Sequence, residues 1–112
     1  MTRPGLVKMT KVEVVIGAED APVVRDLFTS AGVTGYTTVT GVSGMGHAGA
    51  HEGRLLFNDR AGLAMLITVL PDDHVDAILA GLRELFAAHS GVVFVTDTYV
   101  SRPDYFTTDP AG

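Results

Sequence analysis

The chain has 112 residues, of which 46 % are hydrophobic and 19 % charged, and its formal net charge is −5. This length suits one domain with one core, and the acidic balance argues against broad binding to nucleic acid or to an anionic membrane, which require clustered lysine and arginine. Because cysteine is absent, disulfides and thiolate metal sites are excluded. The longest apolar run, Leu63 to Leu70, is too short to cross a bilayer, and the first ten residues lack a signal-peptide core, so we expect a cytoplasmic protein.

The first part of the chain predicts a strand followed by a helix. Residues Leu6 to Ile16 alternate in polarity, which is typical of a strand with one buried face. The residues expected on that face are Val12, Val14 and Ile16. Asp20 is the expected N-cap of a helix that ends at about Ala31, before Gly32. The expected apolar stripe of this helix consists of Val23, Val24, Leu27 and Phe28.

Two further strands flank a glycine-rich stretch. Tyr36 to Val42 is rich in β-branched residues and is expected to be the second strand. It leads into the stretch from Gly41 to Arg60, in which five glycines fall between Gly41 and Gly53. A loop of this length in a compact chain is usually a binding loop or a disordered segment. Leu63 to Leu70 is almost continuously apolar, which indicates a strand covered on both sides.

The last part predicts a helix, a strand and a tail. Pro71 to Asp73 opens the helix, and Ser90-Gly91 ends it. Its apolar residues follow a 3.6-residue period: Val75, Ile78, Leu79, Leu82, Leu85 and Phe86. Val92 to Val100 is expected to be the fourth strand, and the tail, about residues 101–112, has Tyr105 and Phe106 as candidate anchors.

The element order predicts a single α+β domain over residues 1–112. The order β-α-β-loop-β-α-β is that of the ferredoxin-like fold, with an antiparallel sheet, both helices on one face, and the long loop between the second and third strands. Nothing in the chain is left to cover the other face of the sheet. Because apolar residues occur on both faces, we expect the second face to be buried between subunits.

The candidate chemical groups leave one alternative open. His47 and His51 are four residues apart, and Glu52 could add an oxygen ligand, so these three could hold a divalent metal. His74 and His89 are expected to be structural or surface groups. No catalytic motif is present in the sequence, so we expect no enzymatic activity and no cofactor.

Several motifs at consistent spacing resemble those of one family. They are Ala31-Gly32-Val33-Thr34-Gly35 with Thr38-Val39-Thr40, then Gly44-Met45-Gly46, then the run from Val69 to Val75 (VLPDDHV), and finally Gly91-Val92-Val93-Phe94-Val95. Together they resemble the helix-to-strand segment, the loop base, the entry to the second helix and the last strand of the PII signal-transduction superfamily. The resemblance extends over most of the chain.

The resemblance implies a homotrimer that binds adenine nucleotides in clefts between subunits. It also implies that residues 43–61 form the T-loop, the segment with which such proteins engage a regulated partner. The positions implied to bind nucleotide are Thr38, Gly44, Met45, Gly46, His47, Val69, His89, Ser90, Gly91 and Arg102. Of these, His47 takes the place of a phosphate-binding arginine, and Arg102 is displaced by one residue from the family's position.

Other departures from the family pattern refine this expectation. The T-loop is short and lacks a tyrosine, so uridylylation is not expected, and Val92 stands where a lysine would hold phosphate. Fewer cations favour AMP or ADP over ATP. These departures resemble the PII-like branch that accompanies carboxysome and bicarbonate-transport genes, which implies bicarbonate near Arg54 or Arg60 and a partner linked to inorganic-carbon uptake. The alternative is a metal-binding trimer of the same fold.

Overall fold

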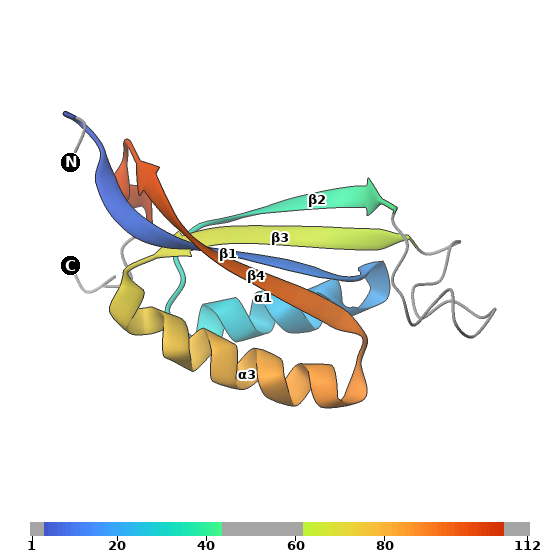
Figure 1. The fold of residues 1–112 in the computed structure, drawn as a ribbon. Coiled ribbons are helices and arrows are strands. Elements are labelled where there is room, and N and C mark those ends of the chain that lie inside the picture. Colours follow the sequence, from blue (N-terminus) through green and yellow to red (C-terminus); the bar gives the residue numbers. More distant parts are fainter. Residues whose placement is uncertain (1–3, 44–61, 107–112) are drawn as a thin grey trace.

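The computed structural model describes residues 4–43 and 62–106, and Figure 1 shows their arrangement. These residues form the expected alternation of strands and helices. The main elements are β1 (Val7–Gly17), α1 (Ala21–Ser30), β2 (Tyr36–Val42), β3 (Leu63–Leu70), α3 (Val75–Ala88) and β4 (Gly91–Val100). Three short 3-10 helices accompany them: η1 (Ala18–Asp20), η2 (Asp72–His74) and η3 (Pro103–Phe106).

The strands form one antiparallel sheet in the order β2-β3-β1-β4. Both α-helices lie on the same face of this sheet (Figure 1). The βαββαβ order and the single helical layer confirm the ferredoxin-like fold that the sequence predicts. The two central strands, β3 and β1, therefore carry most of the core.

The core lies between the sheet and the helices. Val12, Val14 and Ile16 of β1 are fully buried there, as the alternation predicts. The helices contribute Phe28 and Ile78, which are also fully buried. Sheet and helices thus meet through large apolar side chains, which is the main stabilising contribution expected in a domain of this size.

The predicted apolar stripe of α1 faces two different elements, the sheet and α3. Val24 and Phe28, one turn apart, are buried against the sheet, whereas Val23 is 46 % exposed. Leu27 points toward α3, where a Cβ atom added at Gly81 would clash with its side chain. The expectation that all four apolar residues form one buried stripe is therefore wrong for Val23, because the residues at 23 and 27 turn toward α3 rather than toward the sheet.

The sheet face opposite the helices is apolar at one end. Directly opposed residues of neighbouring strands share a face, and one row across this open face is Val39, Met65, Val15 and Val92. The next row is Thr37, Ile67, Glu13 and Phe94. We call these two rows the open face. Nothing in the described ranges covers it, and Phe94 is 50 % exposed.

The two ends of the glycine-rich stretch are held together at one end of the sheet. Gly41 has a φ of 72° and lies at a shift of register between β2 and β3, after which Val42 pairs with Leu63. Gly62 also has a φ of 72°, and the N–H of Ala18 donates to its carbonyl at 3.2 Å. Glycine is needed at both positions because other residues rarely adopt such a φ.

The core predicts one large stability effect. The Phe28→Ala substitution should lower the free energy of unfolding by about 3–5 kcal/mol, because it leaves a cavity where a fully buried ring meets Tyr36 edge-on, with ring centroids 5.8 Å apart. The Val23→Ala substitution on the same helix removes a half-exposed side chain and should change the free energy of unfolding by less than about 1 kcal/mol. Chemical denaturation at one fixed protein concentration measures both, and equal losses would contradict this packing.

Candidate functional site

His89 joins the end of α3 to the start of α1. Its Nδ1 atom lies 3.2 Å from Oδ2 of Asp20. Asp20 does occupy the N-cap position of α1, but its side chain makes no capping hydrogen bond. The predicted N-cap position of Asp20 is thus confirmed, and its carboxylate pairs with His89 rather than with a backbone N–H group of the helix. This contact fixes the short connection that leads through Ser90 to β4.

Gly91 begins β4 at a point of close packing. A Cβ atom there would lie 3.1 Å from the carbonyl oxygen of Val15 and would also press on the ring of Phe86. The position pairs with Ile16 at the end of β1. Glycine is therefore required here for packing, in addition to any role in binding. His89, Ser90 and Gly91 lie together at the end of the sheet where β2 ends and β3 begins, because Gly91 pairs with Ile16 and Ile16 pairs with Ala64.

Arg102 lies at the opposite end of the sheet. Its guanidinium carbon is 4.5 Å from the ring centroid of Tyr105, and its Nε atom is 3.9 Å from Oδ1 of Asp104. The hydroxyl of Thr34 donates to the carbonyl oxygen of Tyr105 at 3.1 Å, which anchors η3 beside the start of β2. Tyr105, one of the two candidate anchors, is thus held through its main chain, whereas its ring is exposed.

The separation of these two ends decides what one subunit can bind. β4 has 10 residues, which at about 3.3 Å each place its ends, Gly91 and Val100, roughly 30 Å apart, and Arg102 follows Val100 by two residues. Thr38 opposes Leu66 on the helical side of the sheet, whereas Val69 opposes Lys11 on the other side. The structure therefore brings His89, Ser90 and Gly91 together, but it does not bring Thr38, Val69 and Arg102 to them within one subunit.

The other predicted ligand residues lie outside the described part of the chain. These are Gly44, Met45, Gly46 and His47 at the loop base, Arg54 and Arg60 as bicarbonate candidates, and His51 and Glu52 of the metal alternative. Within residues 4–43 and 62–106, no three histidine or carboxylate side chains converge as a metal site requires. None of the helices in these ranges is long and apolar enough to span a membrane.

Two contacts near the candidate residues were not predicted. One is the pairing of Asp20 with His89, and the other is the hydrogen bond from Thr10 to Oδ1 of Asp72 at 3.0 Å, which ties the start of η2 to β1. The sequence carries no local signal for either, because the partners are far apart along the chain. Only the fold brings them together.

Comparisons with known proteins agree with this geometry. The family model for nitrogen regulatory protein P-II matches residues 9–105. The comparison with curated proteins finds no match.

The similar solved structures include CPII, a nitrogen regulatory PII-like protein from Thiomonas intermedia K12. With ADP, AMP and acetate bound, it is 37 % identical, with a TM-score of 0.78 over 91 % of this chain and 97 % of that chain. With ADP and bicarbonate bound, it is 40 % identical, with a TM-score of 0.76 over 90 % and 96 %. Its apo form is 37 % identical, with a TM-score of 0.71 over 85 % and 94 %. The chain described here therefore belongs to the nitrogen regulatory protein P-II family.

Proposed function

We propose that this protein is a non-enzymatic signalling protein of the cytoplasm that binds adenine nucleotide between subunits of a homotrimer and, with it, bicarbonate. The observation that carries the proposal is the likeness to CPII, whose solved structures contain ADP, AMP and bicarbonate and cover about nine-tenths of this chain at up to 40 % identity.

The division of the candidate residues supports a site between subunits. Gly91 and Arg102 lie at opposite ends of β4, too far apart for one nucleotide to touch both in the same subunit. A second copy can bring its own Arg102 end to the Gly91 end of the first. The nucleotide site is then complete only in the assembly.

The open face supplies a reason for the assembly. Val39 and Val92, at the two ends of its apolar row, are 38 % and 41 % exposed in the isolated chain. Contiguous exposed apolar surface of this kind marks an interaction site. A closed ring of three copies buries this face in every subunit.

The choice of nucleotide follows from the scarcity of cations. Among the candidates within the described ranges, Arg102 is the one fixed cation, and it already stacks on Tyr105. Each phosphate group added to the ligand needs further positive charge or N–H donors. AMP or ADP is therefore the expected ligand, with His47 and backbone N–H groups of the T-loop base assisting.

The T-loop, residues 43–61, is the proposed output segment. Its ends are adjacent at the same end of the sheet as His89, Ser90 and Gly91, so a nucleotide bound there contacts the loop base directly. A bicarbonate ion held by loop N–H groups and by Arg54 or Arg60 would stabilise one loop conformation. The proposed partner of that conformation is a protein linked to inorganic-carbon uptake or to carboxysomes.

The assembly is tested by charging the open face. The Phe94→Glu substitution places a second carboxylate opposite Glu13 and should convert a trimer into monomers, because burying both charges is unfavourable. The Ala87→Glu substitution adds the same charge to the exposed side of α3 and should leave the trimer intact. Analytical ultracentrifugation measures both, and a monomeric wild-type protein would overturn the trimer.

The nucleotide preference is tested by calorimetry. ADP should bind at least as tightly as ATP, and the affinity for ADP should rise when bicarbonate is present, because ligands that favour one state assist each other's binding. Chloride at the same ionic strength is the control. Binding of ATP about tenfold tighter than ADP would contradict the proposed nucleotide preference. An affinity for ADP that does not change with bicarbonate would contradict the proposed binding of bicarbonate.

A further inference from the structure

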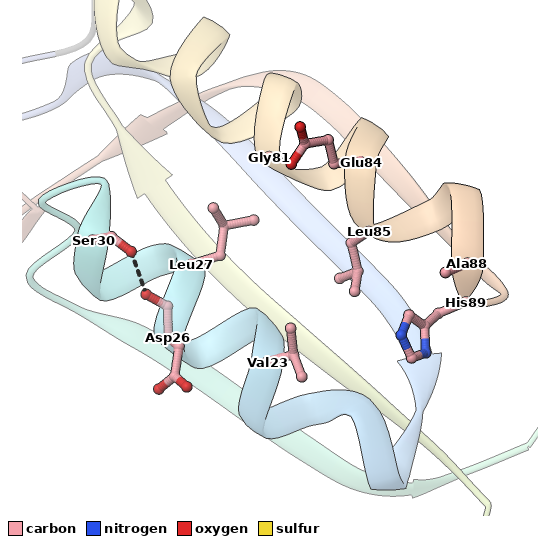
Figure 2. Close-up of a pocket in the computed structure, with 9 residues that line it drawn as sticks. All are labelled: Val23, Asp26, Leu27, Ser30, Gly81, Glu84, Leu85, Ala88 and His89. Atoms are coloured by element: carbon pink, nitrogen blue, oxygen red, sulfur yellow. Dashed lines mark hydrogen bonds between the residues drawn. The ribbon is translucent and has the colours of Figure 1, made fainter.

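A groove runs between α1 and α3 on the outer side of the helical layer (Figure 2). It has a volume of about 470 Å³ and opens to solvent. The helices touch where Leu27 packs against Gly81, and the small side chain of Ala88 leaves room farther along. We call this feature the helical groove. Apart from His89, none of the residues that line it belongs to the open face or to the candidate nucleotide residues.

The floor of the helical groove is apolar. Val23 and Leu27 contribute from α1, and Leu85 and Ala88 contribute from α3. Val23 is 46 % exposed, although its neighbour Val24 is fully buried. An apolar side chain at this position does not serve the core, whereas it can serve as a contact for a partner.

The rims of the helical groove are acidic. Asp26 lines it from α1 and Glu84 from α3, and both residues are exposed. Within residues 4–43 and 62–106 neither carboxylate forms an ion pair, and no lysine or arginine lines the groove. The one basic group at the groove, His89, is already paired with Asp20. The complementary ligand is therefore apolar in its middle and positively charged on both sides.

The shape selects among such ligands. Sites for small molecules enclose most of the ligand surface, whereas this groove is open. Its lining spans residues 23–30 of α1 and residues 81–88 of α3 together with His89, the C-cap. At about 1.5 Å per residue this is roughly 10 Å, or two helical turns. An amphipathic helix with apolar residues at i and i+4 fits a groove between two helices in this way.

We propose that the helical groove binds a basic amphipathic helix of a partner protein, with apolar side chains on its floor and lysine or arginine beside Asp26 and Glu84. The groove is formed by the two helices, and both helices lie on the face of the sheet opposite the open face (Figure 1). It therefore stays accessible when the open face is covered by other copies. The proposal rests on the helical residues and does not require a bound nucleotide, and the groove meets the candidate nucleotide residues only at His89.

The test uses a fluorescein-labelled synthetic helix of about 14 residues with leucines at i and i+4 and lysines on both flanks. Fluorescence anisotropy at about 0.15 M salt measures its binding to the full chain. We expect saturable binding, which Asp26→Asn with Glu84→Gln weakens about fivefold. The Ala88→Trp substitution fills the floor without changing the charge and should weaken binding at least as much.

Two controls separate the groove from general acidity. Asp73→Asn with Asp76→Asn removes one charge from η2 and one from the first turn of α3, both outside the groove. This pair of substitutions should leave binding unchanged. A peptide with the same composition but without the i, i+4 leucine pair should bind weakly. Circular dichroism verifies that each variant is folded.

Three outcomes would overturn the proposal: no binding of the designed helix, equal binding of both peptides, or equal effects of the two pairs of charge substitutions. A fourth would be a change in sedimenting mass on Asp26→Asn with Glu84→Gln, because the groove would then be a contact between copies of this chain. If the wild-type protein failed to bind nucleotide in a separate measurement, the proposed function would fail but the proposal for the helical groove would not.

Discussion

A sheet with apolar side chains on both faces and helices on only one is the constraint on which the rest of this structure depends. The helical layer buries Val12, Val14 and Ile16 of β1, and the protein's internal core is thereby complete. The other face, with Met65 and Val15 at its centre, has no cover within the described part of the chain. Exposed apolar surface of this extent marks an interaction site, and the proposed assembly rests on this consequence of placing both helices on one face.

The same geometry underlies the proposed binding of nucleotide between subunits. A single subunit offers His89, Ser90 and Gly91 at one end of the sheet and Arg102 at the other. In our proposal, each nucleotide joins the two ends from different copies, so binding and assembly assist each other. The proposal also assigns the T-loop, whose flanking residues Val42 and Leu63 pair near the first of these ends, the role of passing the state of the site to a partner.

Much of the fold could be predicted from the sequence, because it is encoded in local periodicity. The alternation in Leu6–Ile16, the β-branched run Tyr36–Val42 and the 3.6-residue period after Pro71 each specify an element and its buried face. Periodicity could not show that Val23 faces α3 rather than the sheet. An apolar residue of α1 fits either position, because the helix packs against both the sheet and α3.

The candidate site was less predictable for a related reason. Its contacts join residues that are distant in the sequence, such as Asp20 with His89. Capping preference predicted the N-cap position of Asp20 but could not predict the partner of its carboxylate. Resemblance identified Gly91, and the structure adds that a side chain there would meet Phe86. The helical groove could not be foreseen, because it depends on how closely Gly81 lets the two helices approach.

The central claim is that each nucleotide site is shared between two copies, and mixed assemblies test it most directly. Ser90→Glu and Arg102→Glu each place a carboxylate at a different end of the sheet, where it would repel phosphate, so neither variant alone should bind ADP. When the two are unfolded and refolded together, some sites combine an unaltered Ser90 end with an unaltered Arg102 end from another copy. The account predicts that ADP binding returns in the mixture, and a mixture that binds no better than either variant alone would contradict it.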